Sequence, residues 1–343
     1  MKSNGLNVFF FTFLVTAAIN CYADDFLLGV NAHILHDTEE NITKTINMSV
    51  DVGIQSLRLD MPWSEVEQKK GQYQIPAKWD YAVDEMIKND MKPLVILEYG
   101  NKNYNNGDKP TDNESRIAFS NYVNFLTAHF KNKVNYYEVW NEWDSSLGGT
   151  SPGNNADYQK LVRSVYPIIK KNNPNSTVIT SAFSSAAFDK HLGIGNDDSM
   201  RTYLDSGIED YTDAFAIHPY TTYKPKPHNK YETYVNDLKY SVSLVTQNKK
   251  LNGKPLYITE IGWSTVAGEK DGVTPQVQCQ NIIQAIRDAK AHGIKALYIY
   301  DFKDDGIVRS TGVHFGLLNY DWSPKQSYLC LKKEFEVNRN ELK

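Results

Sequence analysis

Two glutamates with similar neighbours are the residues of this sequence best suited to carry out a reaction. Glu142 lies in the segment Val-Trp-Asn-Glu-Trp, which ends at Trp143, and Glu260 lies in Ile-Thr-Glu-Ile-Gly-Trp, which ends at Trp263. A carboxyl that starts protonated and a second that starts ionised can together cleave a glycosidic bond, if their surroundings separate their pKa values. A lone glutamate is usually structural, but a pair flanked by aromatic side chains favours this chemistry.

The elements that must position the two glutamates alternate eight times along the chain after Asp24. Short runs rich in Val, Ile, Leu, Tyr and Phe are apolar on both faces, as expected of parallel strands covered by helices. The predicted strands are 26–31, 54–60, 93–99, 134–141, 177–183, 214–219, 256–261 and 296–301. Between them, segments such as 113–130, 158–171, 231–247 and 275–292 have helical periodicity.

This alternation predicts an α/β fold, a single-domain (β/α)8 TIM barrel. A doubly wound sheet is disfavoured, because no glycine-rich phosphate turn follows the first strand. In such a barrel, polar residues at the carboxyl ends of the strands face one mouth. Glu142 would end the fourth strand and Glu260 the seventh, on opposite sides of the ring, so that their side chains can meet across the mouth at the roughly 5–5.5 Å that retaining hydrolysis needs.

Both glutamate segments resemble motifs of the clan A superfamily of (β/α)8 retaining glycosidases. The resemblance continues through 63–73, 97–101, 300–306, 315–318 and 323–325, and it is greatest toward family 39-like bacterial endoglycosidases that cut exopolysaccharides. It implies that Glu142 is the acid/base and Glu260 the nucleophile. The sequence departs from many members at the end of strand eight, where Tyr300-Asp301-Phe302 stands in place of a tryptophan, so that simple cellulase or xylanase activity is not implied.

The resemblance also implies roles for residues near the pair. Asn141 would hydrogen-bond the sugar 2-hydroxyl, and His218 or Tyr220 would orient Glu260. Arg58 would hold Glu260 ionised through its positive charge.

For several of these residues a structural role is an open alternative. Arg58 could instead form an ion pair with Asp60 or Glu98. His33 is either a subsite residue or a satisfied histidine at a strand end. Asp301, at the end of strand eight, completes the polar substrate-binding candidates. The candidate stacking surfaces for sugars, each of which could equally pack in the rim or core, are Trp63, Tyr104, Trp143 and Trp263.

These residues predict an endo-acting β-glycosidase that hydrolyses a polysaccharide, such as a bacterial exopolysaccharide or capsule. An exo-acting β-xylosidase-like enzyme is the first alternative. A non-catalytic carbohydrate-binding barrel is the second, although such a protein would be expected to have lost one glutamate. No cofactor and no metal are expected, since the histidines lack a spacing such as HExxH. The formal net charge of −4 argues against a nucleic-acid partner.

The first 23 residues have the pattern of a signal peptide, with Lys2 before an apolar run that is too short for a comfortable membrane span. We therefore expect a mature domain of residues 24–343 that is periplasmic or secreted, is not stably inserted in a membrane and is a monomer. Cleavage would leave two cysteines, Cys279 and Cys330, which could form a disulfide or remain two buried thiols.

Overall fold

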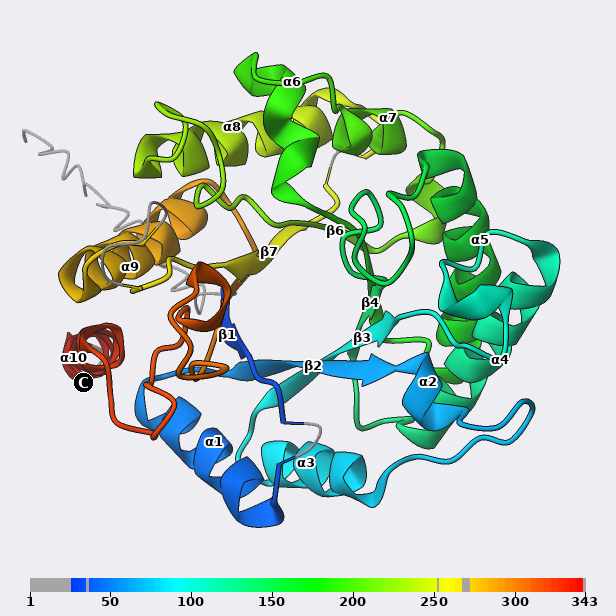
Figure 1. Cartoon of the computed structure of the whole chain (residues 1–343), viewed down its shortest axis with the longest axis horizontal. Coiled ribbons are helices and arrows are strands. Elements are labelled where there is room, and N and C mark those ends of the chain that lie inside the picture. Colours follow the sequence, from blue (N-terminus) through cyan, green and yellow to red (C-terminus); the bar gives the residue numbers. More distant parts are fainter. Residues whose placement is uncertain (1–25, 35–36, 252, 267–271, 342–343) are drawn as a thin grey trace, which may run out of the picture.

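A closed barrel of eight parallel strands forms the centre of the molecule, with the strands in sequence order and helices around them (Figure 1). The computed structural model describes residues 26–34, 37–251, 253–266 and 272–341, so the predicted signal peptide lies outside the described residues. The strands are β1 (Leu27–Asn31), β2 (Ser56–Pro62), β3 (Lys92–Glu98), β4 (Tyr136–Val139), β5 (Thr177–Phe183), β6 (Ala214–Ile217), β7 (Leu256–Ile261) and β8 (Ala296–Ile299). The predicted single-domain TIM barrel is confirmed.

In the part of the chain that the structure describes, seven long helices cover the outside of the barrel: α1 (Glu39–Asp51), α3 (Ala77–Lys88), α4 (Asn113–His129), α5 (Asn155–Asn172), α8 (Tyr231–Gln247), α9 (Pro275–Ala291) and α10 (Gln326–Glu341). Shorter helical segments lie in the connections: α2 (Trp63–Val66), α6 (Asp189–Leu192), α7 (Ser199–Leu204), η1 (Asn105–Gly107), η2 (Ser185–Phe188), η3 (Glu209–Tyr211) and η4 (Thr311–Val313). Side-chain oxygens of Thr38, Asp112, Asn154 and Thr274 accept backbone N–H groups at four helix starts, which fixes where these helices begin. Within the described residues, no helix is long and apolar enough to cross a membrane.

Side chains on the two faces of the sheet form separate apolar clusters. Inside the barrel, the cluster includes Leu94, Ile96, Ile179 and Tyr298. Gly29 on β1 makes room for it, because a Cβ there would lie 2.3 Å from the ring of Tyr298. The larger cluster packs the outer faces of the strands against the helices. The apolar character of both strand faces, from which the barrel was predicted, therefore reflects burial on both sides.

Cys279 on α9 and Cys330 on α10 form a disulfide, with an S–S distance of 2.05 Å. This bond decides between the two alternatives that the sequence left open. It joins the last two helices of the barrel, whose side-by-side packing is visible in Figure 1.

Candidate active site

Glu142 lies in the turn that follows β4, and this turn has an unusual backbone. Trp140 and Glu142 have positive φ angles of 65° and 45°, which side-chain-bearing residues rarely adopt. The turn is tied to both neighbouring strands, because the Trp140 N–H donates to the carbonyl of Leu97 and the Glu142 N–H to that of Ala182. Strand β4 therefore ends at Val139, two residues earlier than predicted. Backbone of this kind is concentrated at functional sites, where it fixes the direction of a side chain.

Glu260 lies at the carboxyl end of β7, on the opposite side of the ring from Glu142. One oxygen of Glu142, one of Glu260 and one nitrogen of His218 all lie within 4.8 Å of one another. The structure thus brings the two glutamates together across the mouth of the barrel. This separation matches the close carboxyl pair of retaining glycosidases and is shorter than the spacing that inverting enzymes need for a water molecule.

Glu260 is held by two donors. Its Oε1 accepts a hydrogen bond of 2.6 Å from Arg58 Nη1, and its Oε2 accepts one of 2.9 Å from the Tyr220 hydroxyl. Burial alone would raise the pKa of Glu260. The charges of His218 and Arg58, with the hydrogen bonds from Arg58 and Tyr220, outweigh burial and hold the pKa of Glu260 below its usual value. An ionised carboxylate is what a nucleophile requires.

Arg58 pairs with a carboxylate that the sequence analysis missed. Its Nη2 donates to Glu138 Oε1 at 2.6 Å and its Nε to Glu138 Oε2 at 3.2 Å, and both side chains are buried. This fork fixes the guanidinium plane and directs Nη1 at Glu260. The ion pair of Arg58 is therefore with Glu138 and Glu260, in place of the Asp60 or Glu98 alternative. A charged residue inside the otherwise apolar β4 run was the available signal, because a buried charge requires a partner.

His218, at the end of β6, lies between the two glutamates. Its Nδ1 is 3.0 Å from Glu142 Oε1 and 3.9 Å from Glu260 Oε2, while its Nε2 is 2.9 Å from the Thr259 hydroxyl. Burial would lower the pKa of His218, but the charges of Glu260 and Glu142 and the hydrogen bond with Glu142 raise it. His218 therefore contacts the proposed acid/base more closely than the proposed nucleophile, and Tyr220 is the residue bonded to Glu260.

Asn141 precedes Glu142, and both the oxygen and the nitrogen of its side-chain amide are hydrogen-bonded. Its Oδ1 accepts from Arg58 Nη2 at 3.0 Å, and its Nδ2 donates to the Tyr99 hydroxyl at 2.8 Å. Tyr99, which follows β3, is a second residue that the sequence analysis did not single out. The predicted contact of Asn141 with a sugar 2-hydroxyl remains a prediction.

A family model of cellulases, glycosyl hydrolase family 5, matches residues 21–303 of the chain. The chain belongs to this family. The predicted resemblance to the clan A retaining glycoside hydrolases is thereby confirmed.

Solved structures of glycoside hydrolases resemble this family 5 chain over nearly all of its length. A family 39 glycoside hydrolase from the gut symbiont Bacteroides cellulosilyticus has a TM-score of 0.75 and 26% identity, over 92% of this chain and 65% of that one. A β-galactosidase from the haloarchaeon Halorubrum lacusprofundi has a TM-score of 0.70 and 14% identity, over 91% and 58% of the two chains. The family 5 chain thus spans less than two thirds of either protein.

A third solved structure is a family 5 (GH5_18) protein from Bifidobacterium longum, crystallised in complex with Manb1-4GlcNAc. It has a TM-score of 0.71 and 12% identity, over 92% of this chain and 78% of that one. At this identity, as for the haloarchaeal enzyme, the likeness shows the fold alone. No curated protein sequence matches the chain.

On the β1 and β8 side of the family 5 barrel, His33 and Asp301 lie close together. His33 Nδ1 is 2.9 Å from Asp60 Oδ2, and its Nε2 is 3.9 Å from Asp301 Oδ2. Burial would lower the pKa of His33, but the hydrogen bond with Asp60 and the charges of Asp60, Asp301 and Asp305 raise it to about 9. The ring remains partly exposed, which suits a subsite residue, while its ion pair suits the structural alternative.

Three of the four predicted stacking rings are buried, and the fourth is half-buried. Trp63, Trp143 and Trp263 are 0%, 1% and 3% exposed, so they present no face to a ligand and the packing alternative holds for them. Tyr104 is half-buried. One face of its ring stacks on Trp63 at 5.0 Å between centroids, and Lys70 Nζ lies 4.5 Å from the ring centre.

Two side-chain clusters in the described part of the chain have the spacing to hold a metal ion. They are Glu142, His218 and Glu260, and His33, Asp301 and Asp305. In the first cluster, both nitrogens of His218 already have partners, so the imidazole has no free lone pair to offer. The expectation that the enzyme needs no metal or cofactor remains a prediction.

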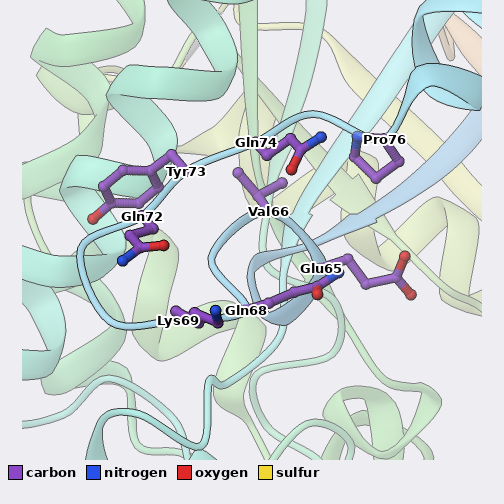
Figure 2. A pocket seen from close by; sticks show the side chains of 8 residues that line it. All are labelled: Glu65, Val66, Gln68, Lys69, Gln72, Tyr73, Gln74 and Pro76. Carbon is purple, nitrogen blue, oxygen red and sulfur yellow. The ribbon is translucent and has the colours of Figure 1, made fainter.

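A separate surface pocket of about 470 Å³ lies in the connection between β2 and α3 (Figure 2). It is lined by Glu65, Val66, Gln68, Lys69, Gln72, Tyr73, Gln74 and Pro76. None of the predicted site residues belongs to this lining.

Proposed function

We propose that this chain is a retaining glycosidase in which Glu260 is the nucleophile and Glu142 the acid/base. The observation that carries this proposal is the close approach of one oxygen from each carboxyl, within 4.8 Å, together with the lowered pKa of Glu260. Their placement at the ends of β4 and β7 supports it as well.

In the first step, Glu142 donates its proton to the glycosidic oxygen while a Glu260 oxygen attacks the anomeric carbon. The bond from that carbon to the leaving oxygen breaks, and an ester to Glu260 forms. Arg58 and Tyr220 hold Glu260 during the attack. His218, close to both carboxyls, can compensate the negative charge that moves from Glu260 to Glu142 as the ester forms.

In the second step, Glu142 takes a proton from water, the water oxygen bonds to the anomeric carbon and Glu260 leaves as a carboxylate. The two inversions give net retention. Asn141, which Arg58 and Tyr99 hold by hydrogen bonds, binds the 2-hydroxyl of the sugar in this scheme, a contact that strengthens in the transition state.

We further propose that the substrate is a polysaccharide cut internally, such as a bacterial exopolysaccharide or capsule, outside the cytoplasm. The Cys279–Cys330 disulfide supports an oxidising compartment. The signal-peptide pattern of residues 1–23 agrees with it.

A product analysis tests this proposal. Purified 24–343 and its Glu260→Gln variant are incubated with β-linked polysaccharides and bacterial exopolysaccharides, and the products are separated by size. Oligosaccharides from the wild type alone support endo hydrolysis, and monosaccharides alone would establish an exo enzyme instead. Binding without release, on a panel that includes the polymer of the cell itself, would favour a carbohydrate-binding barrel.

A further inference from the structure

A small pocket beside the catalytic pair has a lining that differs from the rest of the mouth. It has a volume of about 50 Å³, which is room for a group of one or two heavy atoms. Its lining comes from the end of β1, the segment after β8 and α1, and includes Asn31, His33, Asp37, Asp301 and Asp305. We call it the β1–β8 pocket.

The β1–β8 pocket is acidic. Three aspartates line it, Asp37, Asp301 and Asp305, against two basic side chains. Of these, His33 is already paired with an aspartate outside the lining, and Lys303 has its Nζ 4.7 Å from the ring centre of Tyr320.

Within this pocket, Asp301 has an acceptor without a donor. Its side chain is 1% exposed, and Oδ1 has no hydrogen-bond partner among the described residues. One oxygen of Asp301, one of Asp305 and one nitrogen of His33 lie within 4.8 Å of one another. A buried carboxylate oxygen without a donor is unfavourable, so the two aspartates fit a small ligand group that brings several donors.

Two contacts connect the β1–β8 pocket to the nucleophile. Asn31 lines the pocket, and its Oδ1 accepts from Arg58 Nη1, the same nitrogen that binds Glu260. The ring of Tyr300 lies 5.7 Å from His33 and 6.2 Å from Tyr220. A group bound here therefore belongs to the part of the substrate on the Glu260 side of the cleaved bond.

We propose that the β1–β8 pocket binds the ammonium group of an amino sugar, and that the substrate is a polysaccharide with free amino groups. This inference rests on the proposed glycosidase function. An ammonium has three donors and a positive charge, which match the Asp301 and Asp305 carboxylates. A metal ion fits less well, because it would need a lone pair of His33 as a third ligand, whereas an ammonium needs only the two carboxylates.

The test compares two forms of the same sugar. Binding of glucosamine and galactosamine oligosaccharides and of their N-acetylated counterparts is measured by calorimetry at low salt. A Glu142→Gln background slows turnover, and Asp305→Asn is added to it. Asp84→Asn is the matched control, because it removes the same charge from α3, where Asp84 pairs with Lys133 outside the site.

We expect at least one free-amine oligosaccharide to bind roughly tenfold more tightly than its acetylated form, and Asp305→Asn but not Asp84→Asn to abolish this preference. Equal binding of both forms in every pair would overturn the inference. So would a melting temperature that Mn²⁺ or Zn²⁺ raises in the wild type but not in Asp305→Asn, without an amine preference. If the preference is present but the wild type cleaves no polymer, the ammonium site stands and the proposed glycosidase function fails.

Discussion

The two sides of the barrel mouth differ in whether their buried carboxylates accept hydrogen bonds. On one side, the Arg58 guanidinium donates to both Glu138 and Glu260, and these carboxylates are held by short hydrogen bonds. On the other side, after β8, Asp301 Oδ1 is buried without a partner among the described residues. The first arrangement is complete without a ligand, whereas the second lacks donors that a substrate can bring.

The pKa values follow this difference. Burial acts on Glu260 and Asp301 in the same direction. At Glu260 the positive charges of His218 and Arg58 overcome it and lower the pKa, whereas at Asp301 burial dominates and the pKa is raised well above the usual value. Nearby positive charges and hydrogen-bond donors, more than burial, decide which carboxyl is ionised and available for attack.

The largest effect is expected from Glu260→Gln, which removes the ionised member of the partnered side. An amide cannot form the ester, so kcat should fall by about 10⁴-fold or more, as for other removed nucleophiles. The rate is measured on an aryl β-glycoside, and circular dichroism checks the fold. Activity near the wild-type level would transfer the nucleophile role to another carboxylate.

The next effect is expected from Glu142→Gln and depends on the leaving group. Loss of the proton donor should slow cleavage of a natural glycosidic bond by about 10²–10⁴-fold. The first step on an activated aryl glycoside should be slowed much less, because its leaving group needs no proton. Single-turnover rates on both substrates measure the difference, and an equal loss would argue against the acid role.

Arg58→Gln removes the positively charged donor of the partnered side. Without the guanidinium, the pKa of Glu260 rises, so the acid limb of the kcat/KM profile shifts to higher pH. Glu138 is also left buried and unpaired, which should cost about 3–5 kcal/mol of unfolding free energy. Arg58→Lys, which keeps the charge, should shift the limb less. Unchanged profiles in both variants would remove the electrostatic role of Arg58.

The smallest effect is expected from Asp301→Asn, on the unpartnered side. Because folding raises the pKa of Asp301, its contribution to stability is present below the unfolded pKa and is lost as the pH rises through the folded value. The neutral amide avoids this loss, so the variant should gain about 1 kcal/mol over the wild type at pH 8 relative to pH 5. Urea unfolding at both pH values measures it, and an equal difference at the two values would mean that Asp301 stays ionised.

Much of this architecture could be predicted from the sequence. The eight strands lie within two residues of their predicted ends, because apolar runs of this length between helical segments have few other solutions. The meeting of Glu142 and Glu260 could also be predicted, because the ends of parallel strands converge at one mouth of a barrel. The early end of β4 was not predicted, because the positive φ angles of Trp140 and Glu142 depend on hydrogen bonds to neighbouring strands.

Other features depend on contacts between distant segments and could not be read from the sequence. Trp63 and Trp143 have the same local pattern whether their rings face a sugar or a neighbour, and here other aromatic rings cover them. Glu138 was missed because its partner Arg58 is 80 residues away. The unpartnered oxygen of Asp301 is likewise visible only once β1 and β8 lie side by side.

Trapping of the glycosyl-enzyme tests most directly whether Glu260 is the nucleophile. The enzyme is incubated with an activated 2-deoxy-2-fluoro glycoside of the sugar that it cleaves, digested and mapped by mass spectrometry. The account predicts one added sugar on the peptide that contains Glu260, with none in Glu260→Gln. A sugar on Glu142, Glu138 or any other carboxylate would contradict it.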